Sequence, residues 1–372
     1  MGLKSVVNYL VIIGILTGCG GSGSDAPGLV IPVTNPSLIE IAVTGVPVDL
    51  GNFDPAPTVD AGGGLWMSYS HVSLDGSGLK LIETRLASSM DAGESWTDAG
   101  LSINPATAFT ISAGTVAWAQ EVSRLVYNPF ASGVAADPWI ILWHRYLSTL
   151  NGSETLRLFD NGWIGMKSGN SEVTLGAERK LFTGSLYNAA NDSTIGPPEV
   201  ALDTLDSALA NCLTFTEPGV LPKSNGIYVS LLCATAIPPG KIILLRCDHH
   251  MNNCGYLGTL IDGSEAALLN SGYDNFSASE LVSVDGGDYL IVTPSEATIY
   301  RGCAIYKIAN LDQAEIERDG GTAKPMAVFE AHGDFNGACG YVEGLIGSGV
   351  IISEAFTTSV PTFRLFTTDY NF

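Results

Sequence analysis

The stretch Thr216–Cys233, TEPGVLPKSNGIYVSLLC, has a polar start, a short apolar run, a Ser-Asn-Gly turn and a second, stronger apolar run. Two apolar runs joined by such a turn are typical of two antiparallel strands in a hairpin. The same order recurs four more times along the chain. The other copies begin at Phe53 (FDPAPTVDAGGGLWMSYS), Gln120 (QEVSRLVYNP, continued by DPWIILWHRY), Ala278 (ASELVSVDGGDYLIVTPS) and Gly340 (GYVEGLIGSGVIISEAF).

Each copy is followed by more strand-like sequence, such as LKLIETRLASS after the first and KIILLRCD after the third. Five repeats of about four strands predict an all-β fold, a five-bladed β-propeller. The segment SLIEIAVTG (residues 37–45) precedes the first copy, and the fifth copy ends soon after TFRLFTT. We therefore expect the N-terminal strand to complete the last blade and cover its edge. Two stacked β-sandwiches are the alternative, and the one helix-like segment (residues 199–212) is expected on a loop.

The segment SSMDAGESW (residues 88–96) matches the pattern S-x-D-x-G-x-S-W. It resembles the Asp-box of sialidase-like propellers, which is a hairpin device. We expect Asp91 to bind turn amides, Gly93 to have a positive φ, and Trp96 to pack under the turn. This motif bears on the fold and says little about chemistry.

The chain has 372 residues, with 17 Lys and Arg against 38 Asp and Glu, and a net charge of −21. This charge argues against nucleic acid or an anionic membrane surface as a partner, because both are polyanionic. It does not argue against neutral carbohydrate. We expect a monomer, since no segment of the sequence predicts an oligomer.

The N-terminus has the pattern of an export signal. Lys4 precedes the apolar run VVNYLVIIGIL, which leads into LTGC ending at Cys19. The ending resembles the bacterial lipobox, which implies that Cys19 is lipidated; an ordinary signal peptide is the alternative. We expect a signal peptide at residues 1–18, a flexible tether at 19–36 and the propeller at 37–372. The anchor would be the only membrane contact, in the cell envelope, and the absence of Asp after Cys19 favours the outer membrane.

Six cysteines remain after Cys19, an even number that predicts disulfides in an exported chain. Pairing of neighbours in the sequence predicts three bonds, although other pairings stay open: Cys212–Cys233, Cys247–Cys254 and Cys303–Cys339. No C-x-x-C pair supports a metal site instead. The sequence Asp248-His249-His250 is interpreted as a solvated hairpin tip, with a metal ligand as the alternative.

The innermost strands of a propeller begin around one mouth of its central channel. The five copies place there Asp54, Glu121, Glu217, Glu280 or its neighbour Ser279, and Tyr341 or Glu343. Two carboxylates that face one pocket are what glycoside hydrolysis requires, one as acid and one as base. A third carboxylate can separate the pKa values of these two.

These blade starts resemble those of the five-bladed arabinanase and xylosidase-type glycosidases, glycoside hydrolase family 43 and its relatives. The resemblance rests on FDPAP, AWAQEVSRLVY and FTEPG. It implies Asp54 as general base, Glu121 as pKa modulator and Glu217 as general acid in an inverting hydrolysis of a neutral oligo- or polysaccharide. Two departures are Gln120, where the family has proline, and the inverted order of Glu-Pro-Gly. No cofactor is required, and a structural calcium ion stays open.

Further residues are candidates for substrate binding: Trp118, His144, Arg145, Glu280 and Tyr341. Aromatic faces suit the C–H faces of sugar rings, but Trp66 and Trp143 are better interpreted as core. A non-catalytic surface propeller that binds glycan or a protein is the rival class, with a structural lipoprotein as a third. A sialidase-like exo-glycosidase would need three arginines converging on a carboxylate, and no arginine occupies a blade start.

Overall fold

The chain divides into residues 1–30 and 31–372, and a computed structural model describes only part of the second unit. The described residues are 33–34, 36–47, 49–111, 114–131, 137–151, 154–188, 196–297, 299–329, 334–343, 349–357, 361–370 and 372. Cys19 and the predicted signal peptide lie outside them. No helix in this part of the chain is long and apolar enough to span a membrane.

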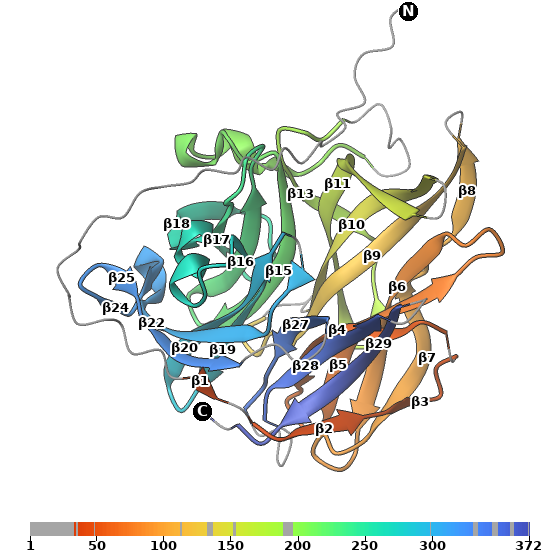
Figure 1. Ribbon diagram of the computed structural model, residues 1–372, viewed down its shortest axis with the longest axis horizontal. Coiled ribbons are helices and arrows are strands. Elements are labelled where there is room, and N and C mark those ends of the chain that lie inside the picture. The colour runs from red at the N-terminus through yellow and green to blue at the C-terminus, as the bar shows by residue number, and fades with distance from the viewer. Residues whose placement is uncertain are drawn as a thin grey trace, which may run out of the picture. The chain divides into compact units, whose positions relative to one another are not determined.

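The strands fall into five successive antiparallel groups, coloured in chain order in Figure 1. The first group is β4 (Gly51–Val59), β5 (Leu65–Leu74), β6 (Lys80–Ser89) and β7 (Trp96–Asn104). The second is β9 (Gly114–Tyr127), β10 (Trp139–Asn151), β11 (Glu154–Ser171) and β13 (Arg179–Thr183). The third is β15 (Thr214–Lys223), β16 (Gly226–Ala234), β17 (Lys241–Cys247) and β18 (Cys254–Asp262). The fourth is β19 (Asn275–Val284), β20 (Gly287–Glu296), β22 (Cys303–Asn310) and β26 (Pro325–Phe329). The fifth is β27 (Phe335–Gly340), β28 (Ile351–Thr357), β29 (Pro361–Thr368) and β2 (Leu38–Ile41).

Shorter elements extend these groups. The remaining strands are β1 (Val33–Thr34), β3 (Val43–Thr44), β8 (Ala108–Ile111), β12 (Thr174–Leu175), β14 (Val200–Ala201), β21 (Ile299–Tyr300), β23 (Glu315–Ile316), β24 (Arg318–Asp319) and β25 (Thr322–Ala323). Short 3-10 helices are η2 (Leu202–Thr204), η3 (Ser207–Leu209), η4 (Gly263–Leu268) and η5 (Leu311–Gln313). The helix-like segment predicted at 199–212 is therefore one short strand and two 3-10 turns.

The two ends of the described chain meet in the fifth group. Strand β2 pairs antiparallel with β29, from Leu38 opposite Thr368 to Ile41 opposite Leu365. The predicted N-terminal strand thus covers the last strand of the chain. Within the range predicted as tether, the β-branched pair Val33–Thr34 forms β1, which pairs parallel with β26.

The first strands of the groups meet one another. Strand β4 packs against β9, β9 against β15, β15 against β19, β19 against β27, and β27 against β4. One backbone pairing, Gly51 with Phe363, joins the first and fifth groups into one sheet. Gly51 has φ 107°, and a Cβ there would lie 1.8 Å from the carbonyl oxygen of Phe363, so only glycine fits.

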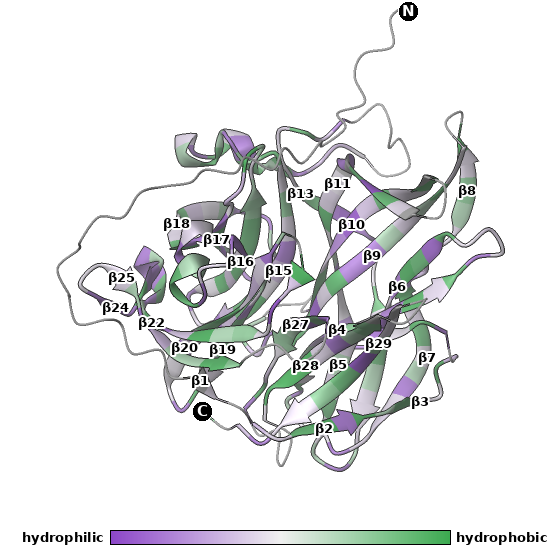
Figure 2. Ribbon diagram, viewed as in Figure 1, coloured by the Kyte–Doolittle hydropathy of each residue, from purple (hydrophilic) through white to green (hydrophobic). Residues whose placement is uncertain are grey.

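The core lies between the faces of consecutive groups, and Figure 2 shows hydrophobic stretches in the strands of every group. Each pair of neighbouring groups shares a buried cluster, exemplified by Ile141 with Leu86, Leu142 with Val229, Leu244 with Leu290, Ile305 with Ile352, and Met67 with Ile351. Each such side chain stabilises the fold by about 1.5–3 kcal/mol when fully buried. Trp143 is fully buried and Trp66 packs against its cluster, which confirms both as core residues.

The predicted disulfide pairing is confirmed. Cys212 bonds to Cys233 and Cys247 to Cys254 in the third group. Cys303 of β22 bonds to Cys339 of β27, which ties the fourth group to the fifth. Neighbours in the sequence pair because the strands that follow one another are also adjacent in space.

The turn between β6 and β7 has the contacts expected of residues 88–96. Asp91 accepts hydrogen bonds from the amide of Ser95 (2.9 Å) and the hydroxyl of Ser89 (2.7 Å). The Ser95 hydroxyl and amide hold the pKa of Asp91 at about 2. Gly93 has φ 94°, and the buried Trp96 donates from Nε1 to the Gly93 carbonyl (3.2 Å). The turn is closed by its own polar groups.

Candidate active site

The first strand of every group contains a β-bulge with one non-glycine residue of positive φ. In all five first strands the pairing shifts register at the bulge; in β9, Val122 and Ser123 lie opposite the single residue Trp143 of β10. The residues of positive φ are Asp54 (53°), Val122 (51°), Glu217 (57°), Ala278 (45°) and Ala338 (51°). A bulge re-aims the side chain that it carries.

This register corrects three of the predicted blade starts. In β9 the equivalent residue is Val122, so Glu121 precedes the bulge by one position. In β19 it is Ala278 rather than Glu280 or Ser279, and in β27 it is Ala338 rather than Tyr341 or Glu343. The repeated polar residues of the sequence do not indicate the bulge in β19 and β27, because the residue at the bulge there is alanine.

Tyr341 lies beyond the end of β27, away from the bulge. It is buried in the hydrophobic cluster of the fourth and fifth groups, and its ring lies 4.6 Å from that of Phe372. The structure therefore places the Tyr341 ring in packing contacts and not beside the bulge of β27.

The structure brings the three predicted catalytic acids together, since the charges of Glu121 and Glu217 both act on Asp54. Asp54 is fully buried, and its Oδ2 accepts from the Ser70 hydroxyl (2.9 Å) and the Val122 amide (3.2 Å). Tyr146 donates to Glu121 Oε1 (2.8 Å). Asp54 Oδ1 and Glu121 Oε2 are buried without a hydrogen-bond partner among the described residues. Each acid thus keeps one oxygen for another group.

Glu217 is the third acid of the cluster and is partly exposed. Its Oε1 accepts from the Tyr300 hydroxyl (2.5 Å), and its Oε2 accepts from the Ala278 amide (2.6 Å). Both donors come from the fourth group, so Glu217 of the third group bridges to its neighbour. Tyr300 was not predicted, since its short strand β21 lies outside the repeated phrase.

Two of the acids, Asp54 and Glu217, have raised pKa values. Burial and then the charge of Glu121 raise the pKa of Asp54 well above its usual range. Burial also raises the pKa of Glu217, although the bonds from Tyr300 and Ala278 oppose this. Like charges in one buried cluster cannot all ionise near neutral pH. Burial thus favours the protonated form of carboxyls in this cluster, and an acid catalyst needs a protonated carboxyl.

One cation lies at the solvent edge of this cluster. The guanidinium Nη1 of Arg157 is 3.9 Å from Glu121 Oε1, and its carbon lies 5.7 Å from the ring centre of Tyr146. The Arg157 side chain is 55% exposed. Glu217 and Tyr300 are also partly exposed, so the exposed part of the cluster consists of Arg157, Tyr300 and Glu217.

The position two residues after the left-handed residue is occupied by a charged side chain in two of the five first strands. Arg124 and Glu280 are both buried there, with Arg124 Nε 2.9 Å from Glu280 Oε2. The equivalent positions in the other first strands are small: Ala56, Gly219 and Gly340. A Cβ at Gly340 would lie 2.3 Å from the Pro55 carbonyl oxygen, so these strands approach closely.

Glu280 was predicted to bind substrate, and the structure assigns its carboxylate to Arg124 instead. Burial raises the pKa of Glu280 to about 7, and Arg124 opposes this shift. The sequence alone does not show this pair, because Arg124 lies two strand groups before Glu280.

A row of aromatic rings borders the acids. Tyr300 stacks on Phe335 with ring centres 4.6 Å apart, and Phe363 lies 6.5 Å from Phe335 and 5.0 Å from Phe53, the neighbour of Asp54. Tyr300, Phe335 and Phe363 are partly exposed. The four residues of this row were not predicted as sugar platforms, because only tryptophans were candidates for that role. The phenylalanines of DFNG and TFR were the available signal.

Trp118 and Arg145, two of the candidates for substrate binding, do not line the acid cluster. The guanidinium carbon of Arg145 is 4.1 Å from the ring centre of Trp118, and both line a cavity that none of the three acids lines. His144 is closer to the acids: it is buried, and its ring lies 5.0 Å from that of Tyr146. Burial lowers the pKa of His144 to about 3, so its ring is neutral.

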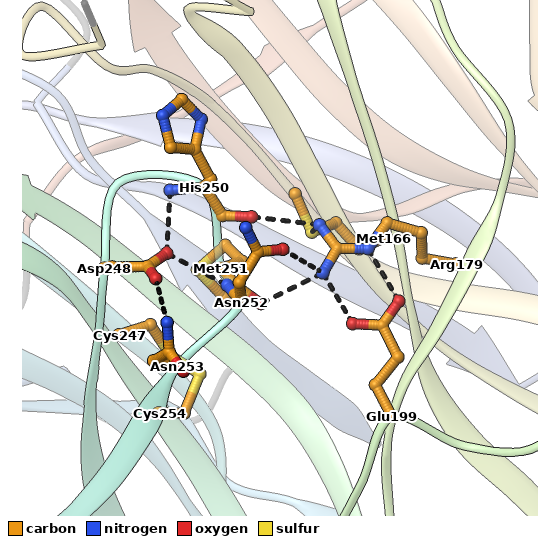
Figure 3. A network of polar contacts seen from close by, with 10 residues as sticks. All are labelled: Met166, Arg179, Glu199, Cys247, Asp248, His250, Met251, Asn252, Asn253 and Cys254. Atoms are coloured by element: carbon orange, nitrogen blue, oxygen red, sulfur yellow. Dashed lines mark hydrogen bonds and ion pairs between the residues drawn. A yellow bond between two sulfur atoms is a disulfide. The ribbon is translucent and has the colours of Figure 1, made fainter.

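The Asp248-His249-His250 segment lies in the turn between β17 and β18, and Figure 3 shows the contacts of Asp248 and His250. Asp248 Oδ1 accepts from the amides of His250 (3.0 Å) and Asn252 (2.9 Å). Arg179 of β13 donates to the carbonyls of His250 (2.9 Å) and Met251 (3.1 Å) and pairs with Glu199. Asp248 is thus used in the turn, and the described residues contain no group of three potential metal ligands.

In sequence, the chain matches no protein-family model and no curated protein. In structure, it is similar to the GH32 beta-fructofuranosidase BmSUC1 of Bombyx mori, with TM-score 0.53 and 13% identity over 90% of this chain and 61% of that one. The chain therefore spans about three-fifths of the length of that enzyme. Weaker likenesses are to a family 117 glycoside hydrolase of Zobellia galactanivorans (TM-score 0.48, 11% identity, 91% of both chains) and a GH43 endo-arabinanase of Bacillus licheniformis (TM-score 0.48, 13% identity, 92% and 97%).

At such low identity the first likeness bears on the fold alone. The chain is therefore an all-β protein with the propeller-type fold of glycoside hydrolases.

Proposed function

We propose that the protein is a five-bladed β-propeller glycoside hydrolase that cleaves a neutral oligo- or polysaccharide with inversion. The five strand groups are the blades, and β2 completes the last one. The observation that carries the proposal is the single cluster of Asp54, Glu121 and Glu217, in which burial raises the pKa of Asp54 and of Glu217 and in which the partly exposed Glu217 lies beside an aromatic row.

In this mechanism Asp54 is the general base and Glu217 the general acid. Asp54 Oδ1 accepts a proton from water while that water attacks the anomeric carbon. Glu217, whose pKa burial raises, gives its proton to the leaving glycosidic oxygen as the bond breaks. An inverting pair is about 6.5–9.5 Å apart, which leaves room for the water. Glu121, held by Tyr146, sets the pKa of Asp54 through its charge.

The LTGC ending supports a lipid anchor at Cys19, and the proposed location is the outer membrane of a bacterial envelope. The substrate class is carbohydrate, and the contacts of residues 88–96 support an Asp-box. Mass spectrometry of the mature N-terminus would detect a diacylglyceryl group on Cys19. An unmodified N-terminus elsewhere contradicts the anchor.

A second candidate function is a non-catalytic glycan-binding propeller. It is favoured by the structural use of the carboxylates, because Asp54 and Glu217 accept the bulge amides of Val122 and Ala278. In the fourth group the hydroxyl of Thr293 does the same for Ala338 (2.8 Å). A carboxylate at these points is therefore of use even without catalysis.

The test is hydrolysis of aryl-glycosides and of arabinan and xylan oligosaccharides by the wild type and Glu217→Gln. Glutamine keeps an acceptor for the Ala278 amide, so the fold is retained while the acid is lost. We expect the wild type to cleave at least one substrate and the variant to be about 10²–10⁴-fold slower. Ala338→Gly, at the same backbone position without an acid, is the matched control. If both proteins are inert while glycan binding persists, the protein is a binder.

A further inference from the structure

The cavity lined by Trp118 and Arg145 has a volume of about 380 Å³ and lies between the first and second strand groups. Residues from both groups line it, among them Asn104 of β7 and Trp118, Arg145 and Lys167 of β9, β10 and β11. A cavity of this volume is within the range of small-ligand sites. The proposed hydrolysis uses none of these side chains.

Arg145 is held rigidly in the wall of this cavity. Its guanidinium carbon lies 4.1 Å from the ring centre of Trp118 and 4.7 Å from that of Trp163. Its Nη1 donates to Glu178 Oε1 at 2.8 Å. The residue is only 6% exposed, yet its Nε has no hydrogen-bond partner among the described residues. A guanidinium fixed in this way is pre-organised for a planar anion.

Asn104 and Lys167 provide further donors at the same wall. Lys167 Nζ donates to the Ile103 carbonyl (2.7 Å) and to Asn104 Oδ1 (2.8 Å). Asn104 is 3% exposed, and its Nδ2 has no partner within the described part of the chain. A buried donor without an acceptor costs free energy, so an acceptor-bearing ligand would be stabilised here.

The charge of the cavity differs in sign from that of the whole chain. Arg145 and Lys167 outnumber Glu178, the acid that lines the cavity with them, while the chain carries a net charge of −21. Phe109, 38% exposed, adds an aromatic face at the rim. Surplus donors, a local positive charge and an aromatic face together suit a ring that bears a carboxylate.

We propose that this cavity binds a carboxylated sugar, a uronic acid unit, with its carboxylate near Arg145 and Lys167 and its ring beside Phe109. The planar guanidinium fork favours a carboxylate over a tetrahedral anion. Only the choice of a sugar rests on the proposed hydrolysis; the preference for a carboxylate rests on the cavity.

The test is calorimetric titration of the full chain with D-glucuronate, glucose, acetate and sulfate. We expect glucuronate to bind and glucose not to bind. Lys167→Gln keeps a polar side chain without the charge, and Arg145→Lys keeps the charge without the fork. Each should weaken glucuronate binding by about tenfold or more. Arg157→Gln, at the edge of the acid cluster, is the matched control and should change binding by less than about twofold.

Several results would overturn the proposal. These are no binding of glucuronate, equal binding of glucose, sulfate binding as tight as glucuronate, and loss of binding in Arg157→Gln but not in Lys167→Gln. If a melting experiment shows that Arg145→Lys does not fold, the glucuronate affinity of Lys167→Gln, at a partly buried position, tests the proposal by itself. Binding is measured without hydrolysis, so this proposal and the glycosidase proposal can fail separately.

Discussion

The five first strands share one backbone device but differ in what it carries. In β4 and β15 the residue of positive φ is an acid, Asp54 or Glu217, and in β19 and β27 it is alanine. The φ angles agree within the narrow range of 45° to 57°. The left-handed residue is therefore a property of the fold, while the chemistry depends on the side chain placed there.

The comparison extends to the amides at the bulges. The amides of Val122 and Ala278 are bound by carboxylates, and that of Ala338 by the hydroxyl of Thr293. A hydroxyl thus suffices for the structural task. The carboxylates add charge and a raised pKa, which a structural acceptor does not need.

The largest expected effect concerns the contact that joins β9, whose left-handed residue is Val122, to β19, whose left-handed residue is Ala278. Arg124 of β9 and Glu280 of β19 form a buried ion pair. Arg124→Met leaves the Glu280 carboxylate uncompensated, so we expect the free energy of unfolding to fall by about 3–5 kcal/mol. Chemical denaturation measures this. Arg124→Met with Glu280→Met should recover most of the loss; a single variant within about 1 kcal/mol of wild type would contradict the pair's role.

An intermediate effect is expected in the pH dependence of the acid cluster. The base Asp54 works ionised, and burial and then Glu121 raise its pKa above the usual 3.8. The rising limb of kcat/KM therefore lies above that value. Glu121→Gln removes the neighbouring charge but keeps an acceptor for Tyr146, so the limb should move to lower pH by about one unit. A shift to higher pH, or none, would show that Glu121 does not act on the base; Ala338→Gly should leave the profile unchanged.

The smallest effect tests the backbone alone. Ala278→Gly and Ala338→Gly relieve a left-handed conformation that disfavours a Cβ, and glycine's greater chain entropy offsets part of the gain. We expect each to raise the free energy of unfolding by about 0.5–1 kcal/mol. Ala304→Gly, in a buried strand position without positive φ, should lower it by a similar amount. Equal losses in all three variants would mean that the bulges carry no strain.

Much of this fold is predictable from local pattern. The alternation of apolar runs and turns predicted the strand groups, and the order of the cysteines predicted their pairing, because successive strands are adjacent. The acids Asp54, Glu121 and Glu217 could be selected because each stands near the start of a repeated phrase. Register was less accessible: alanines at two bulges left no polar mark, and Glu280 and Tyr341 were misplaced as a result.

By itself, then, the sequence determined the all-β class, the repeated strand groups, the disulfides and the candidate acids, since these depend on period and on near neighbours in the chain. Tertiary structure alone decided which side chains meet across groups. Arg124 reaches Glu280, Tyr300 reaches Glu217, and Arg145 is enclosed by Trp118 and Trp163. Those contacts join residues from different strands or groups, and their distances depend on how the groups pack, which no local pattern records.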